Sequence, residues 1–143
     1  FRRTIGGNGS IAPWTERALA EAFSYALEVE DGVASWEFGR PIMEYFRFQA
    51  ADEKPLAMKR VISSGYGAFN NGTDARRYNA ECHTLMFFLL HAEDGKYRQG
   101  VADYMRSSFK GQSAATHLEK ALGIKLKALE PQWIEFVKET ADR

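Results

Sequence analysis

The sequence predicts an all-α fold, a compact multi-helix domain, from three observations. Apolar residues recur at the three- and four-residue spacing that places them along one side of a helix. No stretch alternates apolar and polar residues between turn residues, which is the pattern of a half-buried strand. The chain has 143 residues, of which 45% are hydrophobic and 13% are aromatic. This is enough apolar material for one folded core.

Residues 1–12 are predicted to form an irregular lead-in. They contain the turn cluster Gly6-Gly7-Asn8-Gly9, and no strand precedes it, so a nucleotide-binding glycine loop is not indicated. Residues 13–143 are predicted to form a single helical domain. The chain opens at Phe1 without a methionine, and we expect that processing or truncation removed residues upstream.

The first helix is predicted to begin at Pro13 and to run to about Glu30. Proline is favoured at the first helical position, where its missing N–H costs nothing. The pair Asp31-Gly32 should end this helix. Residues at helical spacing are expected to form its buried stripe: Leu19, Phe23, Ala26 and Leu27.

The middle of the chain predicts a second helix over 36–51 and a short helical piece over 56–62. Glycines and asparagines make 63–72 a loop, after which Thr73 or Asp74 is placed to cap the next helix. Aromatic residues of the second helix could line a groove, but at this spacing they are more typical of core. They are Trp36, Phe38, Tyr45, Phe46 and Phe48.

The second half of the chain predicts four helices. The strongest covers 77–92 and is apolar nearly all round, as expected of a central helix surrounded by others. The next covers 96–109 and ends at Gly111; a shorter helix runs from a Ser113 cap to Leu122 and ends at Gly123. The last covers 126–141, with Pro131 expected to bend it and three inward residues: Trp133, Phe136 and Val137.

Composition excludes several classes of protein. Nineteen basic residues balance nineteen acidic ones, so a nucleic-acid-binding protein is not indicated, although a neutral total leaves room for a local charged patch. No apolar run approaches the length of about 20 residues that a membrane-spanning helix needs. The single cysteine, Cys82, cannot form a disulfide within the chain and is predicted to be a small core residue.

The histidines do not predict a metal site. His83 and His91 are eight residues apart on one helix, which separates them by about 12 Å along its axis, too far to share one ion. We expect both to be polar groups at the helix surface. His117 stands alone among alanines and leucines.

The order of several motifs resembles a known family. The stretch Y-N-A-E-C-H-T-L-M-F-F-L-L-H from Tyr78 is followed by D-G-K-Y-R-Q-G-V-A-D-Y-M, by Ala121-Leu122-Gly123 and by L-E-P-Q-W-I-E-F-V. Over about 13–139 this order resembles the C-terminal half of a bacterial domain-of-unknown-function family of metallopeptidase-like, gluzincin-like proteins. The segments Gly39-Arg40-Pro41 and 55–69 follow the same order, and Pro13-Trp14 with Ala20-Glu21-Ala22-Phe23 is similar to the family's P-W-L-x-E-G-L-A-E-Y-F motif.

The resemblance implies the fold of the C-terminal helical subdomain of a gluzincin-type zinc peptidase. Such enzymes bind zinc through a His-Glu-x-x-His helix and a glutamate from the next helix, which leaves one position for water. This chain has no His-Glu-x-x-His, and Arg17 stands where the family has its glutamate. A shift of one residue would let Glu16 take that role. Tyr78 and Asn79 fall where the family has a tyrosine that steadies the transition state, although a tyrosine that starts a buried helix is the more ordinary explanation.

Three functions remain open at this point. The first is a non-catalytic, degenerate or truncated metallopeptidase-like domain that binds or organises a protein or peptide partner, with no cofactor. The second is the C-terminal part of an active zinc peptidase whose metal-binding helix lies upstream of Phe1, with zinc as its cofactor. The third is an unrelated helical interaction module. The resemblance allows an exported bacterial protein with its signal segment removed, and the sequence leaves the compartment undecided.

Overall fold

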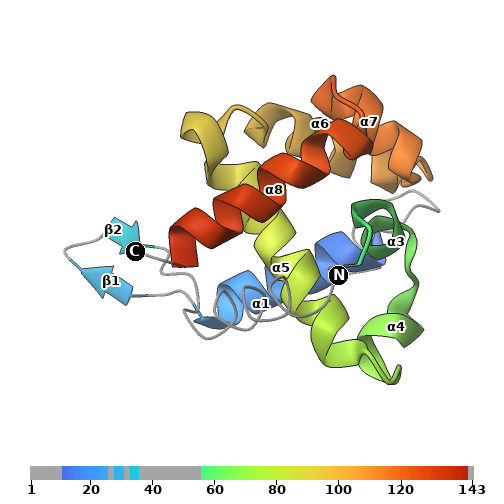
Figure 1. The fold of residues 1–143 in the computed structure, drawn as a ribbon, viewed down its shortest axis with the longest axis horizontal. Coiled ribbons are helices and arrows are strands. Elements are labelled where there is room, and N and C mark those ends of the chain that lie inside the picture. The colour runs from blue at the N-terminus through green and yellow to red at the C-terminus, as the bar shows by residue number, and fades with distance from the viewer. Residues whose placement is uncertain (1–10, 26–27, 31–32, 36–55, 142–143) are drawn as a thin grey trace.

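Helices make up most of the part of the chain that the structure describes. The computed structural model describes residues 11–25, 28–30, 33–35 and 56–141 (Figure 1). None of the helices in these ranges is long and apolar enough to cross a membrane. The elements are α1 (Pro13–Tyr25), β1 (Glu28–Glu30), β2 (Val33–Ser35), α3 (Met58–Ser63), α4 (Tyr66–Asn70), α5 (Ala75–His91), the 3-10 turn η1 (Ala92–Gly95), α6 (Arg98–Phe109), α7 (Ala115–Leu122) and α8 (Leu126–Ala141).

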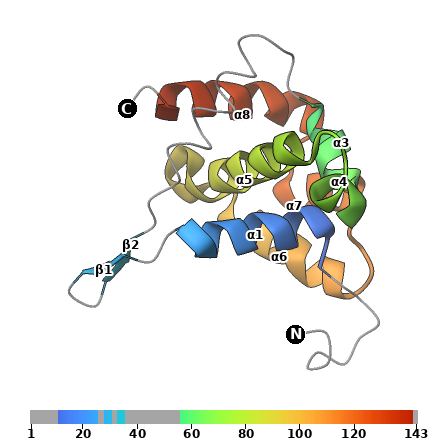
Figure 2. The same cartoon turned by 90° about the horizontal axis from the view of Figure 1, so that it is seen from below.

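Helix α5 lies at the centre of the helical assembly. Figure 2 shows it between α1 on one side and α8 on the other, with α6 and α7 behind. Ten of its side chains are buried, which matches the prediction of a central helix over 77–92. A helix with apolar residues on all sides can bury its apolar surface only when other elements surround it.

Two tryptophans anchor the core on either side of α5. Trp14 and Trp133 are both fully buried, and each indole N–H has a partner inside the protein. Trp14 Nε1 donates to the hydroxyl of Tyr104 over 3.2 Å, and Trp133 Nε1 donates to Thr84 Oγ1 over 3.3 Å. These hydrogen bonds remove the cost of burying a polar group inside apolar packing.

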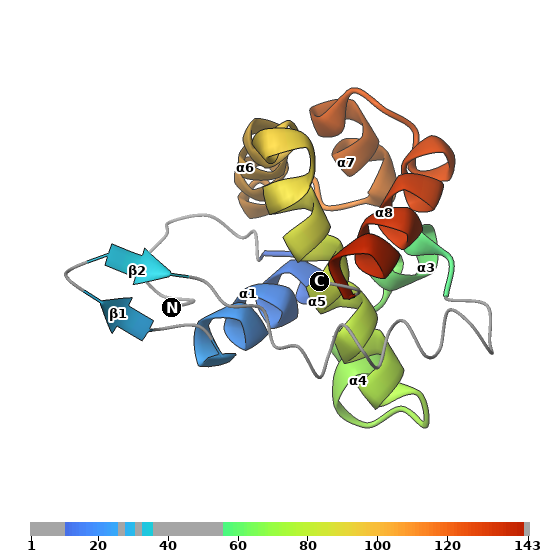
Figure 3. The same ribbon diagram turned by 60° about the vertical axis from the view of Figure 1, so that its left-hand side comes forward.

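A short hairpin corrects the prediction for the first helix. Helix α1 begins at Pro13 as predicted but ends at Tyr25, and β1 and β2 pair antiparallel over 28–30 and 33–35. Valines at 29 and 33 favour extended backbone, and the pairing supplies the hydrogen bonds that a continued helix would have made. The prediction of no strand is therefore wrong here, and Figures 1 and 3 show the hairpin projecting away from the helices.

Of the predicted stripe of α1, the structure describes only the side chain of Leu19, which is not in the core. Trp14 and Ala18, four residues apart, are fully buried, whereas Leu19 is only half-buried. The helix therefore presents a neighbouring face to the core. The side chain of Phe23 lies outside the described part of the chain, as do Ala26, Leu27, the predicted second helix over 36–51 and its aromatic residues.

Helix α4 forms inside the segment that was predicted to be a loop. Its five residues cover little more than one turn, and it ends with the N–H groups of Asn71 and Gly72 both donating to the carbonyl of Gly67. Phe69 is 2% exposed and packs against α5. One buried aromatic side chain stabilises a turn that local glycine content alone would disfavour.

The C-terminal helices agree closely with the prediction, and α8 has the predicted bounds, continuing through Pro131. Gly123 ends α7 with a φ of 70°, the left-handed conformation that glycine adopts without strain. The predicted Ser113 cap is wrong by one residue, because Ala114 takes the cap position. There the His117 ring accepts a hydrogen bond at Nδ1 from the Ala114 N–H over 3.1 Å. Figure 3 shows α6 and α7 beside α8.

Candidate functional site

Glu16 and Arg17, the two zinc-site candidates on α1, both contact α4. The carboxylate of Glu16 accepts a hydrogen bond from the Tyr66 hydroxyl, and the guanidinium of Arg17 donates to Asn70 Oδ1. These two contacts reach the first and last residues of α4. Both candidate side chains therefore link α1 to α4 across the surface.

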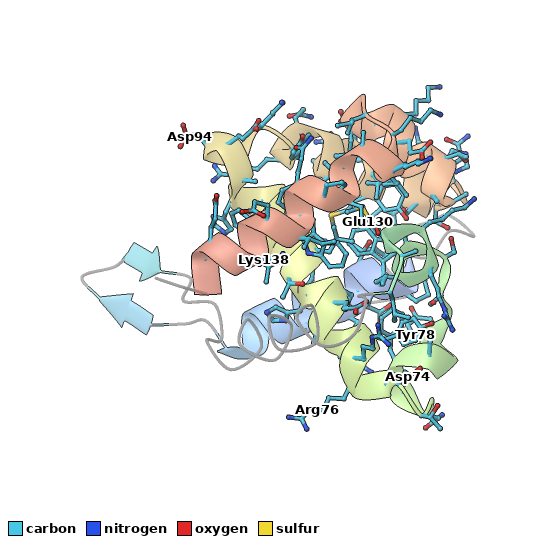
Figure 4. The ribbon with its side chains drawn as sticks, in the orientation of Figure 1. Asp74, Arg76, Tyr78, Asp94, Glu130 and Lys138 are labelled. Atoms are coloured by element: carbon cyan, nitrogen blue, oxygen red, sulfur yellow. The ribbon has the colours of Figure 1, made fainter. Side chains whose placement is uncertain are left out.

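Tyr78 and Asn79, the two candidates on α5, contact the same short helix. The Tyr78 ring meets the ring of Phe69 edge-on, with centroids 5.7 Å apart and planes at 77°. Asn79 Nδ2 donates to the carbonyls of Phe69 and Ala75, over 2.8 Å in each case. Figure 4 shows Tyr78 beside α4, so the structure brings all four predicted residues together around one helix.

The residues of this cluster do not fit a zinc site. The Glu16 carboxylate is bonded to a hydroxyl, and the permanent charge of Arg17 beside it opposes a cation. Within the described ranges, no three His, Cys, Asp or Glu side chains are grouped closely enough to hold a metal ion. This cluster of Glu16, Arg17, Tyr78 and Asn79 therefore supports no metal-dependent step.

The histidines and the cysteine of α5 have different environments. His83 is 1% exposed, so its predicted place at the surface is wrong, and burial lowers its pKa to about 4 and keeps the ring neutral. His91 is exposed as predicted, and partial burial together with the charge of Arg98 lowers its pKa. Cys82 is fully buried, with its Sγ 3.2 Å from the Asn79 carbonyl, which confirms the prediction of a core residue.

A buried carboxyl group on α5 was not predicted. Glu81 is 0% exposed; its Oε1 accepts hydrogen bonds from the Leu56 N–H over 3.0 Å and from Arg77 Nε over 3.3 Å. Its Oε2 has no hydrogen-bond partner among the described residues. Burial is the main cause that raises the pKa of Glu81 to about 7.

A second carboxylate holds the same segment from the other side. Glu130 Oε2, on α8, accepts a hydrogen bond from the Met58 N–H over 3.0 Å, and Figure 4 shows Glu130 close to α3. Repulsion from Glu130 is a further, smaller cause of the raised pKa of Glu81. The residue before α3, Ala57, has no capping side chain, so these two carboxylates replace a local cap.

A groove with an apolar floor lies where the end of α5 and the η1 turn meet α8. Its volume is about 450 Å³. Aromatic and small apolar side chains share the lining with an amide and three carboxylates. The lining residues are Phe88, Ala92, Pro131 and Phe136, with Glu93, Gln132, Glu135 and Glu139.

Contacts between side chains fix the floor of this groove. The ring of Phe136 meets that of Phe88 at 5.5 Å between centroids and that of Phe87 at 5.8 Å. The Tyr97 hydroxyl donates to Gln132 Oε1 over 3.0 Å, which ties the start of α6 to α8. The groove is therefore built on side chains that already have their packing partners.

The turn at one edge of the groove has an uncommon backbone. Glu93, Asp94 and Gly95 have φ values of 47°, 56° and 82°, so three consecutive residues are left-handed. Only glycine adopts this conformation without cost, and each other residue is disfavoured by about 1 kcal/mol. The conformation holds the Glu93 side chain at the groove, where it also pairs with Lys96 over 3.0 Å.

A second hollow, of about 460 Å³, lies between the start of α1, the end of α3 and the start of α7. Small side chains and backbone line most of it, and the one ionisable side chain there, His117, already uses Nδ1 to cap α7. Recognition of a partner requires larger apolar or charged anchors. The groove beside α8 offers both.

No protein family, curated protein or solved structure matches this chain. The likeness to gluzincin-like proteins therefore remains an expectation, and any function has to be argued from the site. The residues of the groove were not singled out in the sequence, where Phe136 was expected to face the core. The sequence does contain one signal of an acidic surface at this place. Glu135 and Glu139 are four residues apart near the end of the last helix, so they lie on the same side of it.

Proposed function

We propose that this chain is a non-catalytic helical domain that binds a segment of a partner protein in the groove beside α8. The observation that carries the proposal is an apolar floor inside a rim of polar side chains. The accessible apolar surface comes from Phe136 and Pro131, and the buried ring of Phe88 packs against Phe136. Binding sites on proteins commonly combine such an apolar centre with a polar edge. The proposal requires no cofactor.

The rigidity of the groove supports this function. Phe88 is 2% exposed and Ala92 is 4% exposed, so the floor is already packed before a partner arrives. Its walls come from helices α5 and α8 and from one short turn. A preformed surface loses little conformational entropy on binding, and more of the contact energy is then available for affinity.

The contacts of the zinc-site candidates favour binding over catalysis. Glu16 and Arg17 are both engaged with α4, and Arg17 brings a positive charge next to Glu16, the carboxylate that the resemblance offered as a zinc ligand. An unrelated interaction module and a degenerate peptidase-like domain would use the groove in the same way. The proposal therefore holds for either origin.

A substitution that fills the groove with a large side chain tests the proposal. Peptides selected for binding to the full chain should lose at least about tenfold in affinity for Gln132→Trp, because the indole would occupy the groove. The exchange also removes the acceptor of the Tyr97 hydroxyl, so the stability of this variant is measured beside its affinity. The matched control is Gln112→Trp, which makes the same exchange at an exposed position after α6. Affinities are measured by titration calorimetry.

Two results would contradict the proposal. One is that selection yields peptides whose affinity is the same for Gln132→Trp and for the parent chain, which places binding elsewhere. The other is that Gln112→Trp weakens binding as strongly as Gln132→Trp. Circular dichroism of both variants confirms that the helices are retained.

A further inference from the structure

We infer that the partner segment is basic: an amphipathic stretch whose apolar side chains enter the groove while lysine or arginine side chains meet its rim. This inference rests on the proposed function and specifies the chemistry of the partner. The rim carries three carboxylates, Glu93, Glu135 and Glu139, and the lining includes no lysine or arginine. The whole chain is neutral, so this acidic surface is a local feature.

The carboxylates stand on two sides of the apolar floor. Glu135 and Glu139 are exposed and separated by one turn of α8, while Glu93 comes from the η1 turn after α5. Like charges one turn apart on a helix repel each other and cost a few tenths of a kcal/mol. A cationic side chain seated between them would relieve this repulsion, which is the electrostatic complementarity that selects a basic partner.

Among the described residues, the basic side chains that neighbour the rim residues in the sequence do not line the groove. Lys96 pairs with Glu93, and both side chains are more than half exposed, at 58% and 60%. Exposed pairs of this kind contribute little and exchange easily for a pair with a ligand. Partial burial and the charge of Arg98 lower the pKa of His91 and so disfavour its charged form, and Lys138 is exposed on α8 without lining the groove.

The floor favours a protein segment over other cations. Aromatic rings attract the aliphatic stems and the charged heads of lysine and arginine, and Phe136 is half-buried at the surface of the groove. A volume of about 450 Å³ accommodates several apolar side chains, more than a simple amine would fill. A nucleic acid would bring phosphates toward carboxylates and be repelled.

Three matched peptides test the inference on the full chain. All are amphipathic helices with the same leucine face, and their polar face carries lysine, glutamine or glutamate. We expect the lysine peptide to bind about tenfold more tightly than the glutamine peptide and the glutamate peptide to bind most weakly, with the differences shrinking as salt is added.

Variants of the rim locate the effect. The double substitution Glu135→Gln with Glu139→Gln should reduce the preference for lysine over glutamine to less than about threefold. The control is Asp74→Asn, an exposed carboxylate at the other end of α5, far from the turn that carries Asp94 in Figure 4. This control should keep the full preference.

The outcomes separate the inference from the function on which it rests. Equal binding of the lysine and glutamine peptides, lost in Gln132→Trp, would overturn the inference and leave the groove as a neutral binding site. Failure of all three peptides to bind would count against the proposed function itself. A preference for lysine that survives the double substitution would place the basic partner elsewhere. Self-association of the parent chain that the double substitution abolishes would assign the groove to a second copy, and would also overturn the inference.

Discussion

Glu81 is a buried acid whose charge is only partly compensated. One carboxyl oxygen accepts two hydrogen bonds, including one from Arg77, while Oε2 has no hydrogen-bond partner among the described residues. Burial disfavours the ionised form and raises the pKa to about 7 from its ordinary value of 4.5. A protonated Glu81 retains the bond to the Leu56 N–H and becomes less costly to bury.

The sign of the resulting pH dependence follows from this shift. Because the pKa of Glu81 is raised in the folded chain, its contribution to stability is fully present below about pH 4.5 and is lost as the pH rises through about 7. At roughly 1.4 kcal/mol per pKa unit, the loss is as much as about 3 kcal/mol. His83, whose pKa is lowered, contributes with the opposite sign, so the test compares two variants that both retain it.

Substituting Glu81→Gln should remove this part of the pH dependence, because glutamine cannot ionise and keeps an oxygen for the Leu56 N–H. The free energy of unfolding, measured in urea, should fall less steeply between about pH 5 and about pH 8 for Glu81→Gln than for the parent. Glu139→Gln, at an exposed position, should follow the parent. Parallel curves for Glu81→Gln and the parent would show that another group governs the dependence.

The roles of individual residues were harder to predict from the sequence than the helices were. Glu16, Arg17, Tyr78 and Asn79 were singled out by resemblance, and the structure does bring them together, but around a helix that lies in a predicted loop. The buried position of Glu81 could not be predicted, because Leu56, whose N–H donates to it, is 25 residues away in the chain. Burial of a charged residue depends on tertiary neighbours that one helix does not specify.

At the scale of elements, helices α6 and α7 are held together at Gly100. A side-chain carbon at this position would lie 2.8 Å from the Ala121 carbonyl oxygen and 2.9 Å from Leu122 Cδ2. Both distances are shorter than any ordinary contact, and one neighbour is backbone that cannot rotate away. Glycine therefore sets the closest approach of the two helices.

Gly100→Ala should destabilise the protein by about 1–3 kcal/mol, because α6 and α7 would have to separate. The control is Gly67→Ala in α4, where an added side-chain carbon meets nothing within 4 Å. That change should be neutral or stabilising by up to about 1 kcal/mol, since alanine favours helix. Thermal unfolding followed by circular dichroism measures both, and a smaller loss for Gly100→Ala than for Gly67→Ala would refute the packing argument.

Elements with a long apolar period were predicted well, and short ones were not. The positions of α5 and α8 follow from apolar spacing, and the end of α7 follows from its cap at Gly123; both signals are encoded locally. Helix α4 and the hairpin after α1 are too short to show a period, and α4 depends on burial of Phe69. Such elements are stabilised by contacts that the local sequence does not contain.

At the scale of the molecule, α5 joins the other helices into one core. Leu89 is 0% exposed near the end of α5, whereas its neighbour Leu90 is half-buried. Leu89→Ala should cost about 2–5 kcal/mol, because it leaves a cavity in the middle of the core. Leu90→Ala should cost clearly less.

Urea unfolding followed both by tryptophan fluorescence and by circular dichroism measures these losses. Trp14 and Trp133 report on either side of α5, so one transition seen by both methods is expected for a single core. Two separate transitions in the Leu89→Ala variant would show that the layers on the two sides of α5 unfold independently. Equal losses for Leu89→Ala and Leu90→Ala would contradict the central place of Leu89.

The predominantly helical fold was predictable from the sequence, but the groove was not. The groove joins residues 88–93 to residues 131–139, and its acidic character is hidden in a composition that is neutral overall. Phe136 was expected in the core, and it does pack there on one side while its other side lines the groove. A surface shared by two distant segments is determined by how the helices pack.

The left-handed turn at Glu93 and Asp94 has a consequence for how this protein can change over generations. A mutation of Glu93 to glycine would relax the backbone by about 1 kcal/mol and remove one carboxylate of the groove in the same step. The mutation that stabilises the backbone at this position is therefore also one that weakens the acidic rim. A lineage that keeps glutamate there is under selection for something other than folding, whereas glycine would spread readily wherever the partner has been lost.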